Sequence, residues 1–514
     1  MRTRVAMVVL PLFLCLLLLT PAPAQSAAAP LRVLLLFDSL AKGTVHEGNV
    51  DELQKQLAAY SAQVTLVHLD QYVKGAMNDY SNVITVINAA DITTDNHVFL
   101  EDLADYKGQY LHIGYNPMAD MKDTLHLSVA VQPGGSASLR IGGLPEASLQ
   151  VQDMPYIAAS EADRSYGNLL FLGSSVQAPY AVSSGKYTYV PYLKQGDGSS
   201  LAMACVLREW LRITDIPHSY LVLKEIYPFT DLSLLQQMAE RLYQKGIPFI
   251  ASIRPVFTNT DFPAMMRYLE ALKAVQARNG SIVVNVPVIG PVISRSDDTL
   301  REKMSSFINL LADQGVAPLG VGAESYWTYD KEYAQDGLLF FDSAVLFPNK
   351  ELHYMEQTNT SKAFISSLYS VPLDDLVTQY KTGSSGLTDL PMDTAIVADF
   401  PEDEAGMENL LQKLEQSWIP FADYKQEAHK VATDTYTITS SQGVISINGQ
   451  ELNIDYSPKA VSADFEYEQK QVKSFTRLFS VQNQFFIVAI IVSLVFFGGL
   501  LVIGYRMYRR KYMK

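Results

Sequence analysis

The sequence predicts a fold of the α/β class, and the central stretch of the chain gives the clearest signal for it. Apolar runs of strand length recur there at residues 220–223, 247–253, 281–289 and 317–323. Amphipathic segments of helical period separate these runs, and they end at Gly246, Gly280 and Gly315. Because neighbouring parallel strands need crossover connections, this alternation predicts parallel strands with helices between them, wound as an open sheet or as a barrel.

Polar side chains follow the predicted strands of this central stretch. Ligands of parallel α/β folds bind at the carboxyl ends of the strands, so these positions form the candidate site. They hold Lys224, Glu225, Arg254, Asn285, Glu324, Ser325, Tyr326 and Trp327. Aromatic rings in and beside this set, Tyr227 included, suit the faces of sugars, although aromatic residues also build cores.

The composition limits the classes of function open to the chain. Its 514 residues are enough for two or three domains, and its formal net charge is -14. This charge argues against a nucleic-acid partner, because phosphate binding requires clustered lysine and arginine. Of the two cysteines, Cys15 lies in the N-terminal apolar segment and Cys205 is alone in the body of the chain. Neither an intrachain disulfide of the mature protein nor a cysteine-based zinc site is therefore possible.

The two ends of the chain predict its topology. Residues 1–24 combine a basic start, an apolar run and small residues before a cleavage site, which is typical of a secretory signal peptide. Residues 485–505 are long and apolar enough for one transmembrane helix, and the basic tail at 506–514 places the C-terminus in the cytoplasm. We therefore expect a single-pass protein of the cell membrane, with a large extracytoplasmic region and partners in the cell envelope.

Three further regions flank the central one. Residues 30–125 alternate strand and helix patterns and predict a small three-layer α/β domain of flavodoxin or amidotransferase type. Its first strand ends at Asp38, which we interpret as a helix-cap or loop residue, and the lack of a cysteine nucleophile there excludes amidotransferase chemistry. Residues 126–215 turn to short β runs and a linking helix, and residues 430–475 combine a hairpin that turns at Asn448 with a charged stalk.

Four segments of the central region carry a resemblance to a known family: YLVLKEIYPFTD, GIPFIASIRPVFTNTD, NGSIVVN and PLGVGAESYW. With them, region 216–425 resembles the polysaccharide deacetylase-like superfamily, and is most similar to its branch labelled domain of unknown function 2334. The resemblance implies a (β/α) barrel that removes N- or O-acetyl groups from cell-wall or capsule sugars. It also implies a divalent metal, held by one aspartate and two histidines, with a neighbouring aspartate as the base.

Compared position by position, the resemblance implies that this metal motif is degenerate. The paired aspartates of the family fall on Lys224 and Glu225. The two histidines, spaced four apart, fall on Asn285 and Ile289, and a further histidine of the branch falls on Ser325. A carboxylate with an amide binds a divalent metal weakly compared with a histidine-rich site. We therefore expect no bound metal and no other cofactor.

The surrounding sequence offers no replacement for the lost ligands. The chain has eight histidines, and none lies between His218 and His353. The preferred hypothesis is thus a pseudo-deacetylase that binds a cell-envelope polysaccharide or exopolysaccharide, or docks the proteins that synthesise or export one. Its candidate saccharide contacts are Tyr227, Arg254, Asn285, Glu324, Tyr326 and Trp327.

Two other interpretations of the same residues stay open. Lys224 and Glu225 could form an interior charge pair that only fills the former metal site. Alternatively, the chain is an active carbohydrate-modifying hydrolase, a deacetylase or a glycoside hydrolase, with an altered site. In the glycoside hydrolase, Glu225 and Glu324 would form a carboxylate pair whose separation sets the stereochemical outcome.

Overall fold

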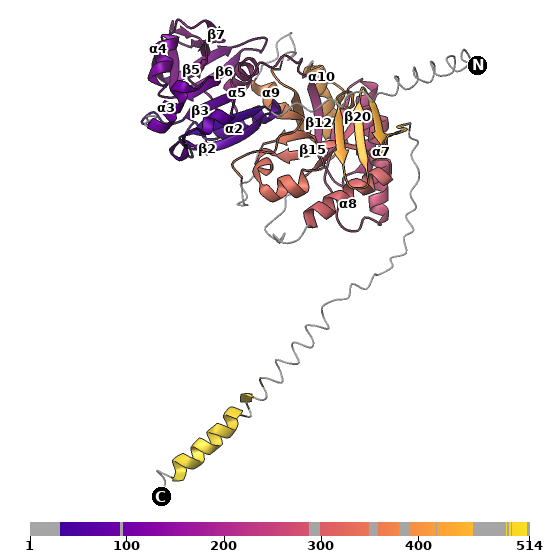
Figure 1. Ribbon diagram of the computed structural model, residues 1–514. Coiled ribbons are helices and arrows are strands. Elements are labelled where there is room, and N and C mark those ends of the chain that lie inside the picture. The colour runs from indigo at the N-terminus through magenta and orange to yellow at the C-terminus, as the bar shows by residue number, and fades with distance from the viewer. Residues whose placement is uncertain are drawn as a thin grey trace, which may run out of the picture. The chain divides into compact units, whose positions relative to one another are not determined.

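The computed structural model describes residues 31–92, 96–286, 299–348, 358–379, 390–417 and 419–455, and near the C-terminus residues 490, 493–494 and 496–510 (Figure 1). The chain divides into two compact units, Met1–Val461 and Ser462–Lys514. The first unit contains the predicted central region and the α/β region that precedes it. All sites discussed below lie in this first unit.

Seven parallel strands of the central region close into a barrel. In order around the barrel they are β12 (Ser219–Ile226), β13 (Phe249–Ile253), β14 (Gly280–Asn285), β15 (Pro318–Glu324), β16 (Ser343–Phe347), β17 (Ser366–Pro372) and β18 (Thr394–Asp399). The last strand pairs with the first, with Val222 opposite Val397. Of the open sheet and the barrel that the sequence left open, the barrel is confirmed. The strands are buried along most of their length, which explains why they appear as near-continuous apolar runs.

Helices connect the strands and cover the outside of the barrel. The clearest are α6 (Leu232–Gln244), α7 (Pro263–Ala277), α8 (Thr299–Asp313), α9 (Leu373–Gln379) and α10 (Glu404–Ser417). Local chemistry sets the ends of α6: Asp231 Oδ1 accepts hydrogen bonds from the backbone N–H groups of Ser233 and Leu234 at 2.9 and 3.0 Å. Gly246, with a φ of 69°, follows its C-terminus in the left-handed conformation.

The N-terminal region forms a three-layer α/β arrangement. Its strands β1 (Arg32–Phe37), β2 (Gln63–His68), β3 (Asn82–Ile87) and β4 (Gln109–Gly114) are parallel, in the order β2-β1-β3-β4. The helices of this region are α2 (Asn49–Ala59), α3 (His97–Asp105), α4 (Ala119–Leu125) and α5 (Gly198–Trp210). Asp38 lies in the loop after β1 and holds the loop after β3, since its carboxylate accepts from the backbone N–H groups of Asn88 and Ala89 at 3.0 Å. This is the loop role predicted for it.

The short β runs that follow the N-terminal region belong to two sheets. Strands β11 (Tyr187–Val190), β10 (Ala181–Ser184) and β7 (Arg164–Tyr166) extend the N-terminal sheet beyond β4, and β11 runs parallel to β4. The other runs form a separate antiparallel sheet in the order β6-β5-β8-β9. Its strands are β6 (Ala147–Ala159), β5 (Ser128–Arg140), β8 (Asn168–Phe171) and β9 (Gln177–Ala178).

A helix of the N-terminal region serves as part of the barrel wall. In the described residues between β16 and β17 there is no helix, and α2 packs against β17 there. The hydroxyl of Tyr369 on β17 donates to Glu52 of α2, whose exposed fraction is 2 %. Lys55 Nζ lies 3.4 Å from Glu52 Oε2 and 4.4 Å from the centre of the Tyr369 ring. The N-terminal region and the barrel therefore share buried polar contacts as well as an apolar core.

We expect the folded protein to lose stability in acid, because His112 is buried in the N-terminal sheet. Burial lowers the pKa of His112 to about 4, and its Nε2 lies 2.7 Å from the carbonyl oxygen of Tyr115. In the unfolded chain the histidine imidazole is protonated near pH 6.5, whereas in the folded chain it stays neutral until the pH is lower. The stability that comes from the neutral, buried His112 is therefore complete above pH 6.5 and is lost as the pH falls toward 4. We expect a loss of about 1.4 kcal/mol of unfolding free energy per pH unit within this window.

Chemical denaturation at several pH values measures this slope. The His112→Gln variant should lose stability less steeply than the wild type below pH 6.5. A matched His97→Gln variant, at an exposed position, should keep the wild-type slope. Equal slopes for the wild type and His112→Gln would contradict the assignment.

A small antiparallel sheet packs beside the barrel near the end of the first unit. Its strands are β19 (His429–Ala432), β20 (Thr437–Ser441), β21 (Val444–Ile447) and β22 (Gln450–Glu451). The predicted hairpin is present between β21 and β22, where Asn448 and Gly449 have φ values of 52° and 78°. His429 ties this sheet to the barrel, because its Nδ1 lies 2.8 Å from Ser343 Oγ on β16.

The predicted targeting and membrane segments are only partly described. The signal peptide at 1–24 and the stalk residues from 456 to 475 lie outside the described residues, as do residues 485–489 of the predicted transmembrane helix. Residues 496–510 are helical. Within the parts of the chain that the structure describes, no helix has both the length and the apolar character needed to cross a membrane.

Candidate functional site

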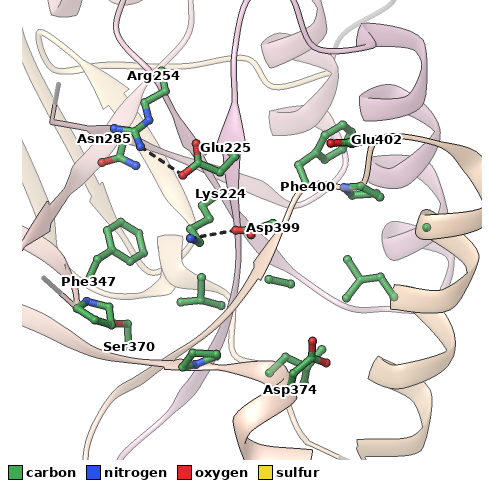
Figure 2. Close-up of a pocket in the computed structure, with 18 of the residues that line it drawn as sticks. Lys224, Glu225, Arg254, Asn285, Phe347, Ser370, Asp374, Asp399, Phe400 and Glu402 are labelled. Carbon is green, nitrogen blue, oxygen red and sulfur yellow. Dashed lines mark hydrogen bonds and ion pairs between the residues drawn. The ribbon is translucent and has the colours of Figure 1, made fainter. Parts of the chain in front are cut away.

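A cavity of about 910 Å³ opens at the carboxyl ends of the barrel strands (Figure 2). This volume is within the range of small-molecule sites, and the location is the one expected for a parallel barrel. The described residues that line it with polar or aromatic side chains are Lys224, Glu225, Arg254, Asn285, Glu324, Trp327, Phe347, Ser370, Asp374, Asp399, Phe400, Glu402, Asn409 and Lys413. Aliphatic and proline side chains from β17, β18, α9 and α10, and from the residues that follow β14, β16 and β18, complete the wall.

A β-bulge at the end of β12 presents two consecutive side chains to the cavity. In a regular strand, Lys224 and Glu225 would point to opposite faces of the sheet. The pairing of β12 with β13 instead shifts register between Leu223 and Ile226, and Glu225 has a φ of 63°. This left-handed conformation is strained for a residue other than glycine, by about 1–3 kcal/mol. Local strain of this kind is concentrated at functional sites in proteins, and here it brings both charged groups to the cavity.

Arg254 and Tyr227 hold the Glu225 carboxylate. Arg254 Nη2 lies 3.3 Å from Glu225 Oε1, and Arg254 Nη1 donates to the carbonyl oxygen of Val286 at 3.3 Å. The hydroxyl of Tyr227 donates to Glu225 Oε2. This hydrogen bond, together with burial, raises the pKa of Tyr227, so the phenol keeps the proton that it donates. Both oxygens of the carboxylate thus have a donor within the protein, which fixes its orientation.

Lys224 pairs with Asp399 across the seam that closes the barrel. The two residues are register partners on β12 and β18, and Lys224 Nζ lies 2.9 Å from Asp399 Oδ1. The backbone N–H of Phe400 donates to the carbonyl oxygen of Lys224 at 2.8 Å. The interior Lys224–Glu225 pair considered from the sequence is thus replaced by two separate pairs, each with a partner from another strand or its following loop (Figure 2).

Asn285 contributes a buried amide to the cavity wall. It is the last residue of β14 and has an exposed fraction of 6 % (Figure 2). Among the described residues, its side chain has no hydrogen-bond partner, although an amide offers two donor hydrogens and an acceptor oxygen. Buried polar groups are nearly always hydrogen-bonded in native proteins. The amide is therefore available to a ligand or to solvent in the cavity.

The cavity brings together most, but not all, of the residues predicted for the site. Lys224, Glu225, Arg254, Asn285, Glu324 and Trp327 line it. Tyr227, Ser325 and Tyr326 are absent from the described lining. Tyr227 instead donates a hydrogen bond to Glu225 and stacks on Phe229 at 4.8 Å between ring centres. Ser325 is buried at the start of a 3-10 helix, Ser325–Tyr329, and Ile289 lies outside the described residues.

Sequence reasoning missed the half of the cavity that comes from the later strands. Phe347, Ser370, Asp374, Asp399, Glu402 and Lys413 come from β16, β17, α9, β18, the loop after it and α10. Ser370 Oγ donates to the carbonyl oxygen of Leu346 at 2.5 Å, and Lys413 Nζ lies 2.7 Å from Asp374 Oδ1. Two of these residues, Phe347 and Asp399, end apolar runs. If those runs had been assigned as strands, Phe347 and Asp399 would have been predicted as site residues, because ligands of parallel barrels bind at the carboxyl ends of the strands.

Comparison with known proteins shows a distant structural similarity. No family model matches the chain, and no curated protein sequence matches it. Among solved structures, the chain is similar to a peptidoglycan N-acetylglucosamine deacetylase in complex with 4-naphthalen-1-yl-N-oxidanyl-benzamide. The two share 10 % sequence identity with a TM-score of 0.24, over 40 % of this chain and 86 % of the other.

Proposed function

We propose that the barrel mouth is a saccharide-binding cleft, and that the chain binds or scaffolds a cell-envelope polysaccharide or exopolysaccharide instead of deacetylating one. The observation that carries this proposal is the pair of ion pairs at the strand ends. One pair joins Lys224 to Asp399, and the other joins Arg254 to Glu225. Each pair places a cationic side chain at or beside a position that the family resemblance assigns to the metal site. The cavity around these pairs is also lined by the amide of Asn285 and by the aromatic rings of Phe347 and Phe400.

The donor set supports binding over metal-dependent hydrolysis. A deacetylase metal requires imidazole and carboxylate ligands around one point. The described residues that line the cavity include neither histidine nor cysteine, and no group of three potential ligands in the described chain is arranged to hold a metal. A divalent ion near Glu225 or Asp399 would have to compete with Arg254 and Lys224. The described residues that line the cavity therefore do not match the ligand set that the resemblance implies.

The cavity walls suit a polyhydroxylated ligand with apolar ring faces. Phe347 and Phe400 face the cavity together with proline and aliphatic side chains. Asn285, Ser370 and Asn409 supply neutral polar groups beside the ion pairs. Recognition sites of this kind combine a mostly apolar wall with a few placed polar groups that orient the ligand.

An obstruction of the cavity tests the proposal. Ala405 lines the cavity from the first turn of α10 and is exposed, so Ala405→Trp should fill space there without disturbing the core. Calorimetric titration of the full chain in detergent with chitin- and chitosan-type tetrasaccharides should show binding that falls at least about tenfold in this variant. Ala119→Trp, at an exposed position of α4, is the matched control and should bind as the wild type does. Unchanged affinity in Ala405→Trp would contradict the proposal.

A carbohydrate hydrolase with an altered site is the second candidate. The observation in its favour is that Glu225 and Glu324 line the same cavity. Against it, both oxygens of Glu225 already accept hydrogen bonds from protein donors, which leaves this carboxylate poorly placed as a nucleophile. Release of reducing sugar that disappears in Glu225→Gln would favour this candidate over the binding function.

Membrane anchoring is the remaining part of the proposal. The support for it comes from the sequence: a signal-peptide pattern at 1–24 and an apolar run at 485–505 with a basic tail behind it. A single anchor would hold the barrel mouth outside the cytoplasm, where envelope polymers are present. Extraction of the chain from membranes by alkaline carbonate, without detergent, would contradict this part.

A further inference from the structure

Two stacked aromatic rings follow the first strand of the barrel and lie outside the described lining of the cavity. Tyr227 and Phe229 come directly after β12, and their ring centres are 4.8 Å apart with the planes 16° from parallel. Phe229 is 82 % exposed, the highest value among the large apolar side chains that the structure describes. Phenylalanine is more often buried, because contact of its ring with water costs free energy. A ring left this open offers apolar surface that a ligand can cover.

Tyr227 connects the exposed ring of Phe229 to the cavity. The Tyr227 hydroxyl donates to Glu225 Oε2, and Glu225 lines the cavity. The guanidinium carbon of Arg254, another lining residue, lies 5.9 Å from the centre of the Tyr227 ring. Isolated apolar side chains are common on protein surfaces, whereas this ring is stacked on a residue that contacts a candidate binding cavity. A ligand that fills the cavity and projects from it can therefore reach the stacked pair.

The turn that carries Phe229 is held at both ends. The backbone N–H of Tyr227 donates to Thr230 Oγ1 at 2.9 Å, and the backbone N–H of Thr230 donates to the carbonyl oxygen of Tyr227 at 3.1 Å. Between them, the ring of Pro228 fixes its own φ. Asp231 caps α6 directly after the turn. A ring presented on such a turn loses little conformational entropy when a ligand packs on it.

We propose that the Tyr227–Phe229 pair is an outer subsite for an extended β-linked polysaccharide, with one sugar ring stacked on Phe229 and the following rings in the cavity. This inference rests on the proposed saccharide-binding function and names the form of the ligand, a chain of several sugars. The faces of β-linked pyranose rings carry C–H groups, which pack against the electron-rich face of an aromatic ring. The hydroxyl groups at the edges of the sugar stay in water there, so the contact requires no polar partner from the protein.

The length of the oligosaccharide tests the inference. The probes are the β-1,4-linked dimer and hexamer of N-acetylglucosamine, titrated calorimetrically against the full chain in detergent. Both are uncharged, so their difference in length adds no attraction to the acidic protein. We expect the hexamer to bind at least about tenfold more tightly than the dimer, and a dimer too weak to detect meets this expectation. Equal affinities would overturn the inference and leave the proposed function standing. If neither oligomer binds, the proposed function and the inference fail together.

Matched aromatic variants separate stacking on Phe229 from other effects of chain length. Phe229→Ala should lower the affinity for the hexamer at least about tenfold, because it removes the stacking surface. Phe229→Trp keeps an exposed ring there and should bind the hexamer as the wild type does, with a change in the emission of the added indole. Tyr243→Ala removes a ring of α6 that is 48 % exposed and outside the described lining, and should leave the affinity unchanged. Wild-type affinity in Phe229→Ala, or an equal loss in Phe229→Trp or Tyr243→Ala, would overturn the inference.

Discussion

Replacing Glu52 with alanine is expected to destabilise the first unit by about 3–5 kcal/mol, because it leaves the buried ammonium of Lys55 without its partner. Glu52 lies at the contact of α2 with β17, where Lys55 and the Tyr369 hydroxyl converge on its carboxylate. Gln56 Nε2 also donates to it at 2.8 Å. The loss should appear as a lower midpoint of chemical unfolding for the barrel and the N-terminal region together.

Two controls make the Glu52 result specific. Glu101→Ala removes an exposed carboxylate, which pairs with Lys74, and should change stability by less than about 1 kcal/mol. The double variant Glu52→Leu with Lys55→Leu removes both buried charges and should be more stable than Glu52→Ala. A Glu52→Ala protein as stable as Glu101→Ala would show that α2 is not an integral part of the barrel wall.

Replacing Asn285 with leucine is expected to cost saccharide affinity by up to about 3 kcal/mol, or roughly 150-fold, since the ligand's hydroxyl groups would be left without a partner in the cavity. Leucine has a similar size to asparagine but no hydrogen-bonding group. Because the Asn285 amide has no partner within the described chain, its loss should cost little stability. Calorimetric titration gives the affinity, and thermal unfolding gives the stability.

The Asn285 prediction has a matched control on the protein surface. Asn453 is exposed and outside the cavity, so Asn453→Leu should bind saccharide as the wild type does. Wild-type affinity in Asn285→Leu would remove the amide from the proposed site. Weak binding together with a large fall in unfolding temperature would show instead that Asn285 supports the fold of the barrel mouth.

The first half of the barrel could be predicted from local patterns, and the second half could not. Strands β12 to β15 alternate with amphipathic helices that have clear ends, such as the Asp231 cap and Gly246. In the part of the β16–β17 connection that the structure describes there is no helix, and α2 from the N-terminal region packs against β17. A helix supplied from about three hundred residues away in the chain leaves no local periodicity to detect.

The expectation that ligands bind at the carboxyl ends of parallel strands led to the polar half of the site. The geometry of the site depends on strand pairing, which no local sequence pattern shows. Lys224 and Glu225 were found as neighbours at a strand end, but the bulge in β12 that turns both to the cavity is a property of the pairing with β13. Their partners, Asp399 and Arg254, follow from the closure of the barrel and from the order of its strands. Hence the residues of the site were predicted better than the pairs that they form.

Metal analysis of the full chain tests the central claim most directly, namely that ion pairs have replaced the metal site of a deacetylase-like barrel. The chain should be purified without chelators, equilibrated with excess zinc and passed through a desalting column before elemental analysis. We predict far less than one zinc per chain, with no difference between the wild type and Glu225→Gln, because Arg254 and Lys224 occupy the neighbouring carboxylates. One zinc per chain, lost in Glu225→Gln, would contradict the account.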